Sequence, residues 1–293
     1  MKKHIFIINP TAGKHKGLEL VSHIKSIYTE AVILETKYPG HASELAKDYA
    51  SPDAIIYSVG GDGTLNEVIN GIMSSEHASQ VTFANVPCGS GNDFIKGFTS
   101  EKDPYKLLDS YRNSDTKAID VGIINGRSFI NISSVGFDAE IVLGAKKYKQ
   151  LPFISAELAY IISVFATLIK LKAYKVKVQI DEKESIIKNI LFITMANGNY
   201  YGGGMNAAPN AIHDDGLFDF CIVDQIKRRQ VPFLLPKFMK GKHEGLKVLK
   251  SIRGRNMTIT SDYPLPLNID GEVLLSDSIT LSIKEKAINL LLP

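Results

Sequence analysis

The sequence contains few cysteines and no long hydrophobic run. Its 293 residues include two cysteines, Cys88 and Cys221. Two thiols are too few for a disulfide framework or a four-thiolate zinc site, so we expect buried, reduced thiols in a cytosolic protein. The longest uncharged apolar run, Leu158–Ile169, has 12 residues, whereas a bilayer-spanning helix needs about 20. The sequence therefore predicts no transmembrane segment.

The amino terminus also lacks the pattern of a secretory signal. Its apolar run, Ile5–Ile8, is only four residues long and is stopped by Asn9-Pro10. No small-residue cleavage site follows, so we expect a cytoplasmic protein.

Several well-known motifs are absent as well. The chain has no G-x-x-x-x-G-K-[ST] loop, and Phe94 occupies the third glycine position after Gly89 and Gly91. A P-loop protein and a Rossmann dehydrogenase are therefore disfavoured. The signatures of zinc metalloproteases, serine hydrolases and protein kinases are missing, and the seven histidines show no ligand spacing.

The composition is that of an ordinary globular protein, with 44% hydrophobic and 22% charged residues. It is long enough for two domains. Residues 1–120 carry a net charge of −3 and residues 121–293 carry +6, and residues 225–255 hold ten basic residues and one acid, Glu244. This basic region could meet nucleic acid, a phosphorylated ligand or an anionic membrane.

The first half of the chain alternates predicted strands and helices. Strands are expected at 4–8, 31–36, 54–59 and 81–86, and helices at 18–28, 41–49, 65–75 and 103–111. This alternation predicts a parallel sheet covered by helices, whose ligands bind at the carboxyl ends of the strands.

The second half is mostly strand. Strands are expected at 121–124, 127–133, 174–180, 186–195, 218–223, 257–261, 265–269 and 279–283, with helices at 154–171 and 230–240. This pattern predicts an antiparallel β domain with helical insertions. The last apolar segment, 287–292, is an expected strand without an evident partner in its own half.

Three glycine loops, at 9–14, 60–64 and 87–93, follow predicted strands and should emerge at one edge of the sheet. Glycines let backbone N–H groups approach a phosphate closely, although any one such loop also fits a simple turn. Asp62 and Asp93 within these loops favour the phosphate interpretation, because a Mg²⁺ ion on phosphates needs carboxylates.

The segment Gly60–Glu67, Gly-Gly-Asp-Gly-Thr-Leu-Asn-Glu, resembles a motif of the bacterial diacylglycerol kinase and lipid kinase family, which is related to sphingosine and ceramide kinases. The resemblance covers essentially the whole chain, and Ser90 stands where the family has threonine. Further matching segments are 9–13, Thr36, 89–93, 120–122, 131–138, 214–217 and 268–272. The Gly-Gly-Asp-Gly-Thr core alone is shared with NAD kinases, whereas Leu65–Glu67 and Asp270–Glu272 favour lipid kinases.

The resemblance implies a two-domain fold. A Rossmann-like α/β nucleotide domain of the NAD kinase and diacylglycerol kinase type, residues 1–122 plus 286–293, would face a C-terminal antiparallel β-sandwich domain, residues 123–285. The terminal strand would return to the first domain.

The resemblance also implies a set of site residues. Asp62 would organise Mg²⁺ and phosphate, Asp93 and Asp120 would join it through water, and Glu272 would be the general base. From the residues alone, Asp120 and Glu272 equally fit plain turns. The implied ATP-binding residues are Asn9, Thr36, Gly60, Gly61, Asp62, Gly63, Thr64, Leu65, Asn66, Glu67, Gly89, Ser90, Asn92, Asp93 and Asp120.

A second, structural Mg²⁺ is implied in the β domain. Asp215 and the backbone carbonyls of Ile212 and Leu217 would hold it, since carbonyl oxygens suit a hard cation. A solvated Asp-Asp-Gly turn is the alternative.

The implied function is an ATP- and Mg²⁺-dependent lipid kinase that phosphorylates a hydroxyl of a membrane lipid, diacylglycerol or a related glycerolipid. The apolar segment Val231–Met239 with its basic flanks fits peripheral docking on the anionic inner face of the membrane, or a solvated basic face. The helix at 154–171 fits an acyl-chain pocket or ordinary packing on the sheet. A kinase of a soluble acceptor such as NAD, and a nucleotide sensor without activity, remain alternatives. No nucleic-acid motif is present, and the sequence leaves a homodimer open.

Overall fold

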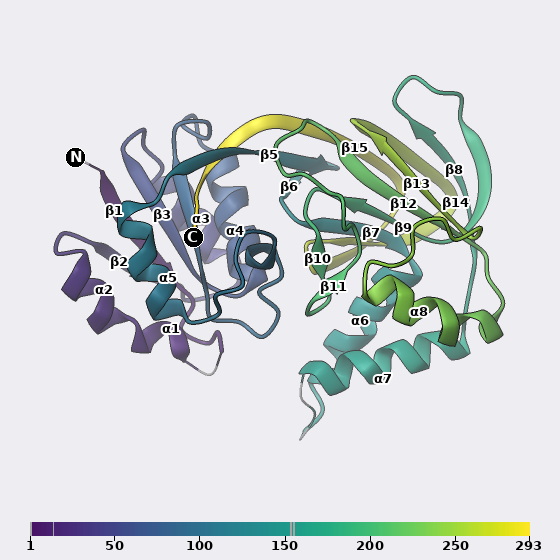
Figure 1. Ribbon diagram of the computed structural model, residues 1–293, viewed down its shortest axis with the longest axis horizontal. Coiled ribbons are helices and arrows are strands. Elements are labelled where there is room, and N and C mark those ends of the chain that lie inside the picture. The colour runs from purple at the N-terminus through teal and green to yellow at the C-terminus, as the bar shows by residue number, and fades with distance from the viewer. Residues whose placement is uncertain (1, 14, 153, 155) are drawn as a thin grey trace.

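The computed structural model describes residues 2–13, 15–152, 154 and 156–293. It has an α/β domain at the amino terminus and a β domain beside it, and two long strands run between them (Figure 1). Lys14, at the end of the first predicted loop, and Ser155, in the predicted helix 154–171, lie outside the described residues.

The first domain is built on a parallel sheet in the order β4-β3-β1-β2. Its strands are β1 (Lys3–Ile8), β2 (Val32–Glu35), β3 (Ala54–Gly60) and β4 (Thr82–Pro87). Its helices are α1 (Lys16–Glu19), α2 (Val21–Ile27), α3 (His41–Asp48), α4 (Asp62–Met73), η1 (Phe94–Gly97), α5 (Pro104–Ser110) and η2 (Tyr111–Asn113). The β3 strand is buried along its whole length because helices cover both faces of the sheet.

The second domain is antiparallel around a core that includes Phe129, Phe218 and Phe220. Its strands are β5 (Thr116–Ile124), β6 (Arg127–Phe129), β7 (Ile132–Gly136), β8 (Tyr174–Ile180), β9 (Ile186–Ala196), β10 (Tyr200–Tyr201), β11 (Met205–Asn206), β12 (Phe218–Asp224), β13 (Leu249–Gly254), β14 (Asn256–Ile269) and β15 (Glu272–Leu291). Its helices α6 (Phe137–Lys149), α7 (Ala156–Ile169) and α8 (Val231–Met239), preceded by η3 (Arg228–Gln230), gather on one side of the strands (Figure 1).

The strand β15 joins the two domains. It pairs with β14 in the β domain, then with β5, and finally lies parallel to β4, where Asn289 and Leu290 pair with Thr82 and Phe83. The terminal segment therefore has its partner in the first domain. The two strands predicted at 279–283 and 287–292 are one continuous strand with an irregularity between Lys284 and Ile288.

Other elements differ from the sequence prediction in detail. The predicted strand 127–133 is the two strands β6 and β7, and the predicted strands 257–261 and 265–269 are the single strand β14 with a register shift. The helix α6 and the strand β13 were not predicted. Among the described strands, β13 lies at the edge of the sheet and pairs with β12. Its exposed residues are polar, so its sequence lacks a clear alternation of apolar and polar residues. Among the described residues, no helix combines the length and apolar character needed to cross a membrane.

Candidate active site

Three glycine loops meet at the carboxyl edge of the parallel sheet, as predicted. A Cβ atom added to Gly13 would lie 1.8 Å from the carbonyl oxygen of Cys88, and one added to Gly89 would lie 2.6 Å from the Cα of Gly61. Only glycine allows backbones to approach this closely. The loops after β1, β3 and β4 therefore form one surface of closely spaced peptide groups.

The start of α4 opens into this surface. Gly61 caps the helix without a side-chain hydrogen bond, and nothing lies within 4 Å of a Cβ placed on Gly63. The first N–H groups of a helix have no partner within the helix and attract anions. This open helix end beside the glycine loops has the form of a phosphate cradle.

Side chains hold the loops in shape. The amide of Asn9 donates to Thr64 Oγ1 at 3.0 Å, and Gly60 packs against the same threonine. Asn92, at a φ of +52°, accepts from the Gly89 N–H at 3.0 Å and donates to the Gly89 carbonyl at 2.7 Å. Ser90 between them is exposed.

Two further predicted ATP residues lie at the margin of the loops. Thr36 follows β2 directly and donates its N–H to the Ile8 carbonyl. Glu67 lies on α4 and accepts a hydrogen bond from the N–H of Ala42, in the first turn of α3. Glu67 thus supports a helix start rather than the loops themselves.

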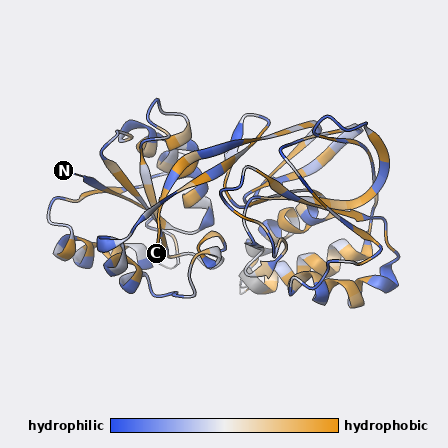
Figure 2. Cartoon of the chain, turned by 45° about the horizontal axis from the view of Figure 1, so that its top comes forward, coloured by the Kyte–Doolittle hydropathy of each residue, from blue (hydrophilic) through white to orange (hydrophobic). Residues whose placement is uncertain are grey.

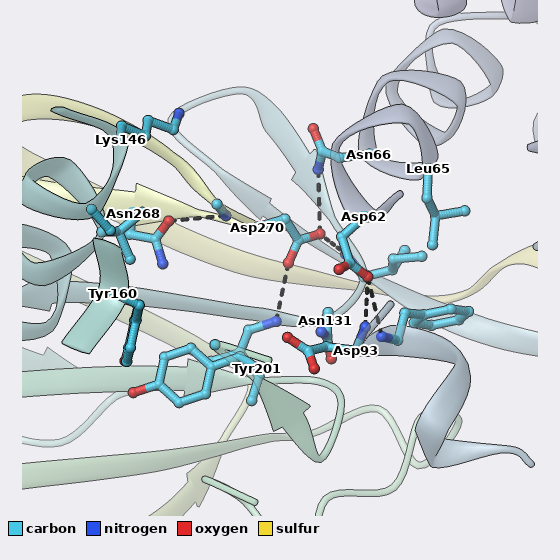
Figure 3. A pocket seen from close by; sticks show the side chains of 17 residues that line it. Asp62, Leu65, Asn66, Asp93, Asn131, Lys146, Tyr160, Tyr201, Asn268 and Asp270 are labelled. Carbon is cyan, nitrogen blue, oxygen red and sulfur yellow. Dashed lines mark hydrogen bonds between the residues drawn. The ribbon is translucent and has the colours of Figure 1, made fainter. Parts of the chain in front are cut away.

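A pocket of about 250 Å³ lies between the glycine loops and the β domain. The α/β domain contributes Asp62, Asn66 and Asp93 to its wall, and the β domain contributes Asn131, Asn268, Asp270, Tyr160 and Tyr201 (Figure 3).

Asp270 projects into this pocket from the turn between β14 and β15. Asp270 and Gly271 form a two-residue hairpin turn with φ values of +43° and +93°. The carboxylate accepts hydrogen bonds from the N–H groups of Ile130 and Ile132, both at 3.0 Å, and from the amide of Asn66 at 3.3 Å. These bonds fix its orientation toward Asp62 and the start of α4 (Figure 3).

The electrostatics of the pocket favour proton transfer near neutral pH. Burial, with a smaller contribution from the nearby charge of Asp62, raises the pKa of Asp270 to about 7. Burial and the neighbouring Asp93 raise the pKa of Asp62 to about 6, although hydrogen bonds from the N–H groups of Asp93 and Phe94 oppose the shift. A carboxylate with a pKa close to the working pH is suited to general base catalysis.

The structure places Glu272, the predicted base, outside the described lining of this pocket, whereas Asp270 lies within it. Glu272 begins β15 on the far side of the turn, and its half-exposed side chain pairs with Arg127. Glu272 therefore remains a predicted base. Asp270, two positions earlier, is a second candidate, and it lines the pocket.

Asp93 connects the domains. Its carboxylate accepts from Lys96 Nζ and from the N–H of Gly203, each at 2.7 Å. Gly203 lies between β10 and β11 of the β domain, so this buried side chain ties the third glycine loop to the opposite wall of the pocket.

Asp120, another predicted site residue, lies at a junction of three segments. Its fully buried carboxylate accepts from the N–H groups of Gly216 and Lys286, both at 2.7 Å. It therefore joins β5, the 214–217 turn and the irregular part of β15, and lies outside the described lining of the pocket. Asp62 and Asp93 line the pocket together, whereas the water-linked participation of Asp120 stays a prediction.

Replacing this buried carboxylate should affect stability more than catalysis. An amide in Asp120→Asn can accept only one of the two hydrogen bonds and turns a donor toward the other, so we expect the free energy of unfolding to fall by about 1–3 kcal/mol. The KM for ATP should not change. Denaturant unfolding and steady-state kinetics measure both quantities. The exposed Asp277→Asn is the control, and an increased KM with unchanged stability would return Asp120 to the nucleotide site.

The predicted structural Mg²⁺ site is occupied by a protein cation. The Asp215 carboxylate pairs with Arg253 and also accepts a hydrogen bond from the N–H of Leu217 at 3.1 Å. The side chain of Ile212, three residues earlier in the chain, is exposed. Across the described part of the chain, no group of three or more His, Cys, Asp or Glu side chains could hold a metal ion. The ion pair with Arg253 competes with a cation at Asp215, and the second Mg²⁺ stays a prediction.

Sequence reasoning assigned no role to several residues of the pocket. The matched segments 131–138 and 268–272 contain three of them, namely Asn131, Asn268 and Asp270. The pair Asp270-Gly271 is also a typical signal of a hairpin turn. Asn131 leaves its buried Oδ1 without a hydrogen-bond partner in the described structure. Tyr160 and Tyr201 lie in segments whose sequence gives no comparable signal.

Comparison with known proteins agrees with this arrangement. The model of the diacylglycerol kinase catalytic domain matches residues 3–124, and that of the YegS C-terminal NAD kinase beta sandwich-like domain matches residues 131–292. A diacylglycerol kinase of Bacillus subtilis is 28% identical over 93% of this chain and 90% of its own length.

Solved structures share the fold. A diacylglycerol kinase from Bacillus anthracis superimposes with a TM-score of 0.75 at 20% identity, covering 100% of this chain and 97% of the other. An NAD kinase from Archaeoglobus fulgidus in complex with ATP gives a TM-score of 0.54 at 13% identity, covering 98% and 93%. The α/β domain with its glycine loops and the β-sandwich domain both match, and this chain belongs to the diacylglycerol kinase-like family of lipid kinases.

Proposed function

We propose that this protein transfers the γ-phosphate of ATP to a hydroxyl of a membrane glycerolipid, diacylglycerol or a close relative, in the presence of Mg²⁺. The observation that carries the proposal is the position of Asp270. Its carboxylate faces Asp62 and the phosphate cradle across a pocket with a largely apolar remainder.

The α/β domain supplies the nucleotide site. The N–H groups at the start of α4 and the loop around Gly89 would hold the phosphates, and Asn9 and Thr64 fix the loops that present them. Asp62 would hold the catalytic Mg²⁺, which when bound supplies neutralisation of the phosphate charge. A second ion at Asp215 would first require Arg253 to move away, so no step depends on it.

The β domain supplies the base. Asp270 would accept the proton of the lipid hydroxyl as its oxygen attacks the γ-phosphorus, while the N–H groups of Ile130 and Ile132 keep the carboxylate in place. The apolar side chains of Leu65 and Val142 help to exclude water from the pocket, which limits hydrolysis of ATP.

The charge of the pocket favours a neutral acceptor. Its described lining contains Asp62, Asp93 and Asp270, and Lys146 is the only cationic side chain among these lining residues. Lys146 is exposed at the surface. Lys96 pairs with Asp93. An acceptor such as NAD, which carries two phosphates of its own, would still meet repulsion from Asp62 and Asp270, whereas the neutral head of a diacylglycerol would not.

The pKa of Asp270 predicts the pH dependence of the reaction. The base acts only when deprotonated, so kcat/KM should increase tenfold per pH unit below about 7 and level off above it. A pH profile with saturating ATP·Mg²⁺ measures this. A profile that is flat between pH 5.5 and 8 would argue against a base with a raised pKa.

The proposal is tested by phosphate transfer from radiolabelled ATP·Mg²⁺ into a total lipid extract and, in parallel, into NAD. We expect a labelled lipid with the wild-type protein and about a hundredfold less label, or weaker still, with Asp62→Asn. Label in NAD, or no label in any lipid although ATP binds, would contradict the proposal.

A further inference from the structure

An apolar cavity of about 350 Å³ lies directly behind the acceptor pocket, between α7 and α8. Tyr160 and Tyr201 line both spaces and form the wall between them. A smaller apolar cavity of about 70 Å³ continues beneath α8 and shares Phe137, Phe192 and Phe238 with the first. Apolar space therefore extends from the pocket of Asp270 to the two helices.

This cavity reaches the protein surface between α7 and α8. Its rim includes Ile161 and Phe165 of α7, which are 50% and 65% exposed, and Met239 of α8, which is 45% exposed. The same side chains thus line the cavity and face the solvent. An opening of this kind would admit an apolar chain from outside the protein.

The surface around the opening is unusually apolar. Ile161, Phe165 and Ile169 follow one another at intervals of four residues, so they form a single outward stripe on α7, and Ile169 is 70% exposed. Phe233 on α8 is 74% exposed. Figure 2 shows hydrophobic residues along both helices. Exposed apolar patches of this kind mark interaction surfaces.

Basic side chains border the apolar surface. Lys237 and Lys240 lie four and seven residues after Phe233 and share its outward face of α8, and both are exposed. Four more basic residues lie close by in sequence, namely Lys227, Arg228, Arg229 and Lys242. Within the described part of the chain, none of these six side chains takes part in an ion pair, so their charge is available to an anionic partner.

We propose that α7 and α8 dock on an anionic lipid bilayer with Phe165, Ile169 and Phe233 inserted, and that the acyl chains of the substrate enter between these helices. The inference rests on the lipid kinase function proposed above and identifies the surface through which that site meets its substrate. Apolar side chains ringed by lysines fit the acyl region and the anionic headgroups of a bilayer at the same time. The cavity behind the opening leads the acyl chains away from the hydroxyl, which stays beside Asp270.

The test uses the double variant Ile169→Ser/Phe233→Ser, because neither side chain lines the cavity, with Leu275→Ser as the matched control. Leu275 is 66% exposed on β15, in the part of the β domain that carries neither α7 nor α8. Binding is measured by sedimentation with vesicles of phosphatidylglycerol and phosphatidylcholine. Activity is measured with dioleoylglycerol in the same vesicles and with dioctanoylglycerol dispersed in buffer.

We expect the double variant to bind vesicles about tenfold or more weakly, because two large apolar side chains no longer leave water. Its activity on dioleoylglycerol in vesicles should fall by a similar factor, whereas its activity on dispersed dioctanoylglycerol and its melting temperature should match the wild type. Leu275→Ser should behave as wild type throughout.

Vesicle binding by the double variant equal to that of the wild type would overturn the inference. So would a wild-type dimer that dissociates in the double variant, because the apolar face would then belong to a second copy of the chain. If the wild type phosphorylates neither lipid, the proposed function fails, and the vesicle-binding arm still decides whether this surface meets a membrane.

Discussion

Replacing Asp270 by asparagine should reduce kcat by about 10²–10⁴-fold, the usual contribution of a general base. The amide keeps the size of the side chain but cannot take up the hydroxyl proton. Steady-state transfer of phosphate to dispersed dioctanoylglycerol measures the effect. Binding of ATP should be retained, because the proposed nucleotide contacts lie on the α/β domain.

Glu272→Gln is the matched control for this substitution. The two carboxylates are two residues apart, yet Glu272 is half-exposed and paired with Arg127 while Asp270 faces the pocket. We expect Glu272→Gln to keep a kcat near that of the wild type. The opposite outcome, with Glu272→Gln inactive and Asp270→Asn active, would mean that the turn rearranges when substrate binds.

Replacing Asp62 by asparagine should reduce kcat by about 10²–10³-fold through the loss of electrostatic stabilisation at the transferring phosphate. The remaining amide oxygen can still accept the N–H of Asp93, so the loops should keep their shape. The specific readout is calorimetric ATP binding with and without Mg²⁺. The wild type should bind ATP more tightly with the ion, and the variant should not respond to it.

The exposed Asp48→Asn, at the end of α3, provides the control for the loss of one negative charge. If Asp62→Asn retained both its activity and its response to Mg²⁺, the ion would have to be held by other groups. A lower melting temperature without a change in Mg²⁺ response would give Asp62 a purely structural role in joining the two glycine loops.

The meeting of the three glycine loops was predictable because its signals are local. Each of the three loops follows a short apolar strand, and the carboxyl ends of parallel strands lie at one edge. Glycine is needed at positions 13, 61 and 89, where one backbone lies against another, so these contacts can be recognised from the glycines in the sequence. The strand pattern of the second half predicted the antiparallel domain, and the family resemblance then supplied its sandwich form and the return of the last strand.

The acceptor half depends on contacts between distant segments. Asp270 is a base candidate because its carboxylate accepts hydrogen bonds from the N–H groups of Ile130 and Ile132, about 140 residues earlier in the chain. The sequence around the turn does not indicate these partners. Asp120 likewise fits a strand start in the sequence. Its role follows from Gly216 and Lys286, which only the folded chain brings to it.

The helix α6 shows the same limit in secondary structure. Its apolar residues Ile141, Val142 and Leu143 are consecutive and are followed by Gly144, so the helical period is weak. In the fold, Gly144 is required because a Cβ there would lie 2.2 Å from Ser163 Oγ on α7. Packing between the two helices, rather than local preference, determines this segment.

The most direct test of the account is a crystal structure with a non-hydrolysable ATP analogue, Mg²⁺ and dioctanoylglycerol bound together. The account predicts the γ-phosphate at the start of α4, the lipid hydroxyl within hydrogen-bonding distance of Asp270, and the acyl chains passing Tyr160 toward α7 and α8. A lipid hydroxyl beside Glu272 and Arg127, or acyl chains that leave the pocket by another route, would contradict it.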